Sequence, residues 1–147
     1  MGAIIFDFDG VIADSEAIAA LLDALGYAGT APFIQRRMAQ LIEHPDENVL
    51  VAVDGTQVVG VISLHFIPQL ALAGDFCRIS YFCVDERSRG DGIGALLEAH
   101  AVAAAKARGC DRVELHCHAR RTMAHHFYER QGYVESPRYY VKSLVDA

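Results

Sequence analysis

One stretch of the chain combines residue types and spacing suited to binding an anion. Residues Val84 to Gly94 read Val-Asp-Glu-Arg-Ser-Arg-Gly-Asp-Gly-Ile-Gly, between a strand-like run, Ile79 to Val84, and an Ala/Leu-rich helical segment. A helix start leaves main-chain N–H groups unpaired, and glycines let a phosphate approach without a Cβ in the way. Arg87 and Arg89 add positive charge. The sequence therefore predicts a phosphate-bearing ligand held mainly by the main chain.

The spacing within this loop separates it from two common nucleotide motifs. It has neither the Lys-Ser/Thr end of a P-loop nor the third glycine of the dinucleotide fingerprint. From Arg89 to Gly94 it reads R-x-x-G-x-G, and a second motif, A-x-x-F-Y-x-x-x-G-Y, runs from Ala124 to Tyr133. In this order the two motifs resemble the GNAT superfamily of N-acetyltransferases, and the resemblance covers roughly Ser15 to Val145.

The resemblance implies acetyl-CoA as cosubstrate and a set of cofactor-binding residues. Main-chain groups of Phe82, Cys83 and Val84 would contact the pantetheine arm. Arg121 stands where most members have Asn and is a candidate for a CoA phosphate. The loop and helix start would hold the pyrophosphate through Arg89, Gly90, Asp91, Gly92, Ile93, Gly94 and Ala95. A main-chain site should tolerate Glu86, which stands where many members have proline.

Two catalytic candidates follow from the same resemblance. Tyr128 occupies the family's general-acid position, where a phenol can protonate the departing CoA thiolate. His116 matches a position on the fifth strand where some members carry an acidic base, and histidine is a suitable base near neutral pH. Glu114 and His118 alternate onto the same strand face. A chain of waters acting as the base is an equally open alternative.

Apolar periodicity and turn residues predict an α+β fold with a mixed, GNAT-like sheet in the order β-α-α-β-β-β-α-β-α-β-β. Asp54-Gly55 predicts a hairpin, and Gly26 and Gly109 predict helix ends. Expected strands are Ala3 to Phe8, Asn48 to Val53, Gln57 to Phe66, Phe76 to Val84, Arg112 to His118 and two within Tyr133 to Leu144. Expected helices are Ser15 to Leu25, Ala31 to Glu43, Ile93 to Arg108 and Thr122 to Gln131.

The composition favours one compact domain over residues 1–147, with 1–14 as an atypical first strand and loop. Of the 147 residues 52% are hydrophobic, and the net charge of −6 argues against nucleic acid as a partner. No apolar run is long enough to cross a membrane, and no secretory signal is apparent. The four cysteines show no C-x-x-C pair, which favours reduced thiols and a cytoplasmic location. No metal site is expected, because neighbouring strand residues Cys117 and His116 point to opposite faces.

A competing signal lies at the N-terminus. Ile4 to Glu16 resembles the first motif of haloacid dehalogenase (HAD) phosphatases, with Asp7 as nucleophile and Asp9 as general acid/base near Mg²⁺. Two carboxylates at a strand end can hold a cation and attack phosphorus. However, no later strand ends in the acids that would complete the metal site. The segment is therefore expected to supply only the first strand of the fold.

The hypothesis is an acetyl-CoA-dependent N-acetyltransferase in which an amine attacks the thioester directly. Acetyl-CoA would bind where the strands Phe76 to Val84 and Arg112 to His118 splay apart. The acceptor, a small molecule or a peptide, is not encoded; Gly26 to Pro32 and Tyr133 to Tyr140 are its expected walls. A Mg²⁺-dependent phosphatase and a non-catalytic acyl-CoA-binding module are the alternatives, and a homodimer is left open.

Overall fold

A computed structural model describes residues 3–7, 12–117, 121–136 and 139–145 of the chain. Its contacts divide the chain into two compact units, Met1–Leu115 and His116–Ala147, and each is described by itself. The expectation of a single domain over residues 1–147 stays a prediction. Asp9 and His118 lie outside the described residues.

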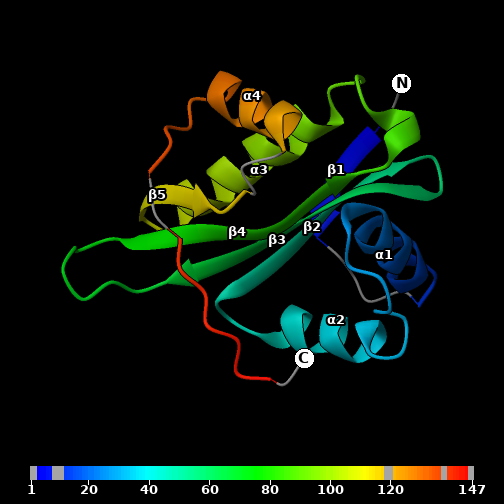
Figure 1. Cartoon of the computed structure of the whole chain (residues 1–147), viewed down its shortest axis with the longest axis horizontal. Helices are drawn as coiled ribbons and strands as arrows, with labels where there is room; N and C mark the ends of the chain where they lie inside the picture. The colour runs from blue at the N-terminus through cyan, green and yellow to red at the C-terminus, as the bar shows by residue number, and fades with distance from the viewer. Residues whose placement is uncertain (1–2, 8–11, 118–120, 137–138, 146–147) are drawn as a thin grey trace. The chain divides into compact units, whose positions relative to one another are not determined.

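The first unit is a five-stranded sheet with three α-helices (Figure 1). The strands lie in chain order across the sheet. They are β1 (Ala3–Asp7), β2 (Glu47–Asp54), β3 (Gln57–Ile67), β4 (Asp75–Val84) and β5 (Cys110–Leu115). The helices are α1 (Ile12–Leu25), α2 (Ile34–Glu43) and α3 (Ile93–Ala107), and a short 3-10 helix, η1 (Glu86–Ser88), precedes α3.

Strand pairing changes character at β4. Strands β1 to β4 pair antiparallel, whereas β4 and β5 pair parallel. The β4–β5 register runs from Asp75–Cys110 to Ile79–Leu115, and β4 then continues to Val84. On the other side of β4, Ile79 pairs with Leu64 and Tyr81 with Ser63, so Ser80 is the extra residue of a β-bulge.

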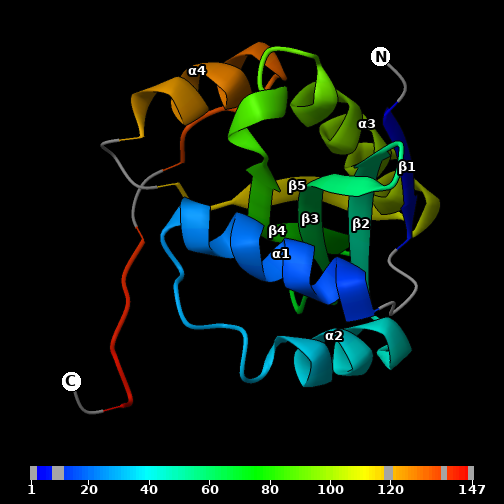
Figure 2. The same ribbon diagram turned by 90° about the vertical axis from the view of Figure 1, so that its right-hand side faces the viewer.

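Helices cover both faces of the sheet: α3 lies on one, and α1 and α2 lie on the other (Figure 2). Each face therefore has its own apolar cluster. Alternating residues supply the two clusters, because Leu50 and Ala52 of β2 pack on the α3 side while Val49 and Val51 pack with α1 and α2. Ile18 of α1 is 2% exposed.

Helix α3 is held against the sheet by small and branched side chains at four-residue spacing. Leu97 and Ala101 are fully buried and Ala105 is 3% exposed. Strand β3 carries Gly60 opposite this stripe, where an added Cβ would lie 2.9 Å from Leu97 Cδ1. The glycine thus leaves room for the helix side chain, and α3 is seated close to the strands.

The second unit contains one helix, α4 (Thr122–Arg130), within its described residues. Gly132 has φ 94° and donates its N–H to Glu129 O at 3.0 Å, which ends the helix. The Tyr128 ring lies 5.4 Å from that of Phe127 and 5.6 Å from that of Tyr133. Both distances join ring centroids, and the three aromatic rings pack against one another.

The α+β class and the order of elements up to α4 are confirmed, including the pairing of β1 beside β2 and the packing of α1 on the sheet. Two expectations are wrong. The expected strand Arg112 to His118 is shifted: β5 begins at Cys110 and ends at Leu115, so His116 and Cys117 follow it. A parallel strand lasts only as long as its partner stays beside it, and the β4–β5 pairing ends at Ile79.

The two strands expected within Tyr133 to Leu144 are also absent from the described residues 133–136 and 139–145. Val134, Tyr140 and Val141 are all at least 79% exposed. The residues of this segment have a high β propensity, which means that their side chains suit a pleated sheet. A strand also needs a neighbouring strand at the edge of a sheet to pair with. Pro137, the expected break between the two strands, lies outside the described residues.

The seating of α3 gives a test of the fold. Leu97→Ala should lower the free energy of unfolding by about 2–5 kcal/mol, because it removes a fully buried side chain and leaves a cavity. Leu96→Ala is the matched control on the same helix, since Leu96 is 37% exposed. Urea denaturation followed by circular dichroism measures both. Equal losses in the two variants would contradict the described orientation of α3.

Candidate active site

The glycine-rich loop begins where β4 leaves the sheet. The N–H of Asp85 donates to Val59 O at 2.7 Å, which carries the strand contact one residue beyond β4. The Asp85 carboxylate then accepts from Arg87 N at 2.9 Å and caps η1. The chain turns away from the sheet at this cap, so the following residues are free to form a loop over the start of α3.

The loop enters α3 through glycines that hold left-handed backbone conformations. Gly90 has φ 89° and Gly92, the N-cap of α3, has φ 81°. The N–H of Leu96 donates to Gly92 O at 3.0 Å. The N–H groups of Ile93, Gly94 and Ala95 precede this bond, at the positive end of the helix dipole. These are the main-chain groups for which the sequence predicts an anion site, and the anion site itself stays a prediction.

The two arginines of the loop differ in their surroundings. Arg87 donates from Nε and Nη2 to Asp85 at 3.2 and 3.0 Å, and these hydrogen bonds lower the pKa of the Asp85 carboxyl. Arg87 is thus an ion-paired side chain. Arg89 donates from Nε to Val84 O at 3.3 Å, which places its side chain against the last residue of β4. Of the two, Arg89 remains the candidate for a phosphate.

Beyond Ile79, β4 runs past the end of its register with β5. Phe82 and Val84 pack toward the α3 side, whereas Cys83 packs toward α1 and donates its thiol to Leu21 O at 3.2 Å. The segment expected to contact pantetheine is therefore anchored by side chains on both faces. Its course leads from the end of the β4–β5 register to the glycine loop.

Three predicted site residues belong to the second unit. Burial is the main cause that raises the pKa of Tyr128 to about 12, and the nearby Cys117 adds to it, so the phenol is protonated at neutral pH. Arg121 is the N-cap residue of α4. His116 is exposed, and its ring stacks on Tyr139 with centroids 4.0 Å apart.

The structure thus brings together the ten predicted residues that lie between Phe82 and Ala95, all in the first unit. It changes the setting of the base candidates. His116 follows β5 and does not alternate with Glu114 within it. Glu114 itself accepts hydrogen bonds from Arg78 at 2.6 Å and Arg112 at 3.1 Å. Burial raises the pKa of Glu114, but these bonds outweigh it and lower the pKa below the ordinary value.

Sequence reasoning missed one group of polar residues on β2, β3 and β4. His65 Nε2 lies 2.5 Å from Ser80 Oγ, and His65 Nδ1 contacts Glu47 Oε2. The three residues come from separate strands, so no motif joins them. The signal available in the sequence was a histidine inside an apolar strand, on the same strand face as Ser63 and Val61.

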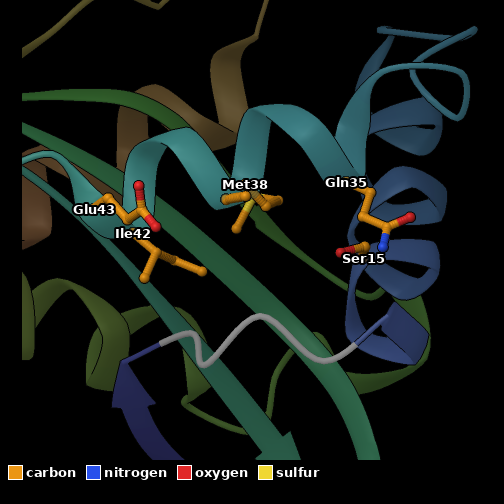
Figure 3. A pocket seen from close by; sticks show the side chains of 6 residues that line it. Ser15, Gln35, Met38, Ile42 and Glu43 are labelled. Atoms are coloured by element: carbon orange, nitrogen blue, oxygen red, sulfur yellow. The ribbon is translucent and has the colours of Figure 1, made fainter.

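A hollow outside this region lies between α2 and the beginning of α1 (Figure 3). It is lined by Ser15, Gln35, Met38, Ala39, Ile42 and Glu43, none of them a predicted site residue. Among the described residues no group of three or more His, Cys, Asp or Glu side chains could hold a metal ion. No described helix has the length and apolar composition needed to cross a membrane.

Comparison with known proteins identifies the family. The acetyltransferase (GNAT) family model matches residues 17–133. An aminoalkylphosphonate N-acetyltransferase of Salmonella typhimurium is 35% identical over 100 residues, which are 68% of this chain and 65% of that protein. The alignment thus spans less than two thirds of the curated relative.

Solved structures share the fold at low sequence identity. Glucosamine-6-phosphate N-acetyltransferase from Arabidopsis thaliana is 21% identical, with a TM-score of 0.84 over 99% of this chain and all of that one. A structure described as a transcriptional regulator from Bacillus halodurans is 22% identical, with a TM-score of 0.87 over 97% of this chain and 100% of that one.

The match of the family model over residues 17–133 defines the class of this protein. The chain belongs to the acetyltransferase (GNAT) family. The family match favours acetyl transfer over the phosphatase alternative, and residues Ala3–Asp7 of the phosphatase-like segment form the edge strand β1.

The anion site can be tested by thermal-shift titration with CoA. Gly92→Glu should remove most of the stabilisation by CoA, because it places a negative side chain against the N-terminus of α3. Gly109→Glu is the matched control: Gly109 also has positive φ (75°) and open space around an added Cβ, but lies at the opposite end of α3. A CoA-induced shift that Gly92→Glu leaves unchanged would place the ligand elsewhere.

Proposed function

We propose that this chain transfers the acetyl group of acetyl-CoA to the primary amine of a small acceptor. The observation that carries the proposal is the passage from β4 through the Gly90–Gly92 loop into α3, whose first-turn N–H groups precede the helical ladder. Family membership supports the same cosubstrate.

The covalent order of the cofactor gives each part of β4 a role. With the pyrophosphate at Gly90 to Ala95 and the pantetheine arm along Phe82 to Val84, the thioester comes next, beside Tyr81 and Ser80. Two supports for this arrangement are the end of the β4–β5 register at Ile79 and the bulge at Ser80. Catalysis then comes mainly from proximity and from main-chain polarisation of the thioester carbonyl.

The second unit supplies the remaining proposed groups. Tyr128, protonated at neutral pH, donates its phenolic hydrogen to the departing sulfur. Arg121 contacts a CoA phosphate, and His116 stays a candidate for the base that receives the amine proton. The alternative, a non-catalytic acyl-CoA-binding module, needs no proton donor at Tyr128. Turnover of acetyl-CoA with an amine would exclude this alternative.

The acceptor is proposed to be a small amine that enters over the α1–α2 loop. Tyr27 of this loop meets Tyr81 of β4 edge to face, with ring centroids 5.2 Å apart, and this contact supports the loop as a wall of the acceptor site. The name of the Salmonella relative makes aminoalkylphosphonates the first acceptors to test. The four free thiols support a cytoplasmic location, and the homodimer is kept as a hypothesis for analytical ultracentrifugation.

Turnover of acetyl-CoA with a panel of amines tests the proposed function. The panel holds aminoalkylphosphonates, aminoglycosides, polyamines, amino acids and peptide N-termini, with colorimetric detection of the released thiol. At least one class should give amine-dependent thiol release, and mass spectrometry should find the acetylated amine. Release of thiol by none of the amines, in a protein that binds CoA, would overturn the proposal in favour of a binding module.

Tyr128→Phe tests the proposed acid. Loss of a proton donor should lower kcat by ~10²–10⁴-fold, whereas the KM for acetyl-CoA changes little because the ring and its packing persist. Met123→Leu is the control on the same helix, since Met123 is 85% exposed. Steady-state kinetics with an accepted amine measures both, and a Tyr128→Phe enzyme with unchanged kcat would remove Tyr128 from the mechanism.

A further inference from the structure

A row of three polar side chains in contact with one another crosses the sheet on its α1 and α2 face. Glu47 of β2 contacts His65 of β3, and His65 contacts Ser80 of β4. The side chains of Glu47 and His65 are 18% and 25% exposed, and Ser80 is exposed. The row therefore runs from a largely buried carboxylate to a hydroxyl open to the surroundings.

The bulge in β4 places Tyr81 on the same face as Ser80. Before the bulge, Cys77 and Ile79 point to the α3 side; after it, Cys83 points to the α1 and α2 side. The extra residue breaks the alternation, and Ser80 and Tyr81 are consecutive exposed residues. Tyr81 meets Tyr27 on this face and Ser80 meets His65, so both side chains face the expected entry of the acceptor.

The chemistry of the three groups sets the direction of the hydrogen bonds. An ionised carboxylate only accepts, so the ring nitrogen that faces Glu47, Nδ1, carries the hydrogen. In the neutral imidazole Nε2 is then an acceptor, and the Ser80 hydroxyl donates to it at 2.5 Å. This order, hydroxyl to imidazole to carboxylate, holds the imidazole in the tautomer that can receive a proton at Nε2.

We propose that Ser80, His65 and Glu47 form the proton relay that deprotonates the acceptor amine, with His65 as the general base. The inference rests on the proposed function, which puts the thioester beside Ser80. An amine with a pKa near 10 arrives mostly as ammonium and must lose a proton before its nitrogen can attack. That proton passes to Ser80 Oγ as the Ser80 hydrogen passes to His65 Nε2. Glu47 stabilises the resulting imidazolium.

The rest of the step balances without another reactant. The nitrogen lone pair forms the C–N bond, the C–S bond breaks, and its electron pair leaves on sulfur. The departing thiolate receives a proton from Tyr128, as in the proposed function, and the Tyr128 phenolate takes a proton back from solvent after product release. The amide nitrogen loses its second extra proton to water, and the imidazolium returns its proton to solvent after product release. Ser80 keeps its hydroxyl throughout and forms no bond to the acetyl group.

The charged residue opposite His65 on β4 forms an ion pair with β5. Arg78 of β4, the cross-strand partner of His65, donates to Glu114 of β5 at 2.6 Å. Glu114 also accepts from Arg112. The Glu114 carboxylate is thus committed to two arginines, whereas the Ser80 hydroxyl is exposed at the end of the row.

Kinetics of three variants test the relay with an amine that the wild-type protein acetylates. His65→Gln, which cannot take a proton, should lower kcat by ~10²–10⁴-fold with little change in the KM for acetyl-CoA. Ser80→Ala should lower kcat by ~10-fold or more, and Ser80→Thr, which keeps the hydroxyl, should retain activity. His100→Gln is the control, since His100 is an exposed histidine on α3.

A second acceptor separates a base from a merely structural histidine. A β-fluorinated analogue of the same amine is less basic and arrives largely neutral, so it needs the relay less. The loss of kcat caused by His65→Gln should therefore be smaller for the fluorinated amine. A purely structural role would give equal losses for the two amines, and that result overturns the relay.

Further outcomes are equally decisive. If His65→Gln fails to fold, Ser80→Ala decides alone, because it alters an exposed side chain; unchanged kcat in that variant overturns the relay. Acetylated Ser80, seen by mass spectrometry with acetyl-CoA alone, also overturns it, because Ser80 would then be a nucleophile. Wild-type protein that acetylates no amine removes the proposed function and the relay together. Wild-type activity with an unaffected His65→Gln variant removes only the relay.

Discussion

The end of the β4–β5 pairing is the constraint on which the candidate site depends. Parallel strands stay paired only as long as their backbones exchange hydrogen bonds. Here the β4–β5 register stops at Ile79–Leu115, while β4 continues to Val84. The bulge at Ser80 coincides with this point. A bulge bends and twists its strand, so the change in direction and the loss of the neighbour occur together. The last residues of β4 then lead to the glycine loop instead of lying inside a closed sheet.

Helix α3 gives this end of β4 a rigid support. Helix α3 starts directly after the loop and is fixed to the sheet by Leu97, Ala101 and Ala105, all 3% exposed or less. Its first turn carries the main-chain N–H groups of the candidate anion site. The buried side chains in the middle of the helix thus fix the position of these groups. On the opposite face, α1 is held through Ile18 and through the Cys83 thiol, which donates to Leu21 O. The same strand is thus anchored from both sides.

The polar row of Glu47, His65 and Ser80 lies on a face of the sheet that is apolar at one end and polar at the other. Val49 and Val51 follow Glu47 on one face of β2 and pack beneath the helices. Toward the other end of the strands, the same face turns polar and holds the imidazole between a carboxylate and a hydroxyl. The buried apolar residues next to this polar row restrict the side chains of the row to one geometry.

The sequence alone determined the class of fold, the order of the elements through α4, and the family, because these follow from local patterns: apolar periodicity, Asp54-Gly55, and the glycines of one loop. Those glycines do have the positive φ that their role demands, at Gly90 and Gly92. The end of β5, the irregular course of residues 133–136 and 139–145, and the row through His65 were decided by tertiary structure alone. Each depends on which strand lies beside which. Propensity measures how well a side chain suits a pleated strand, whereas pairing joins residues far apart in the chain, such as His65 and Glu47, through a register that no local pattern encodes.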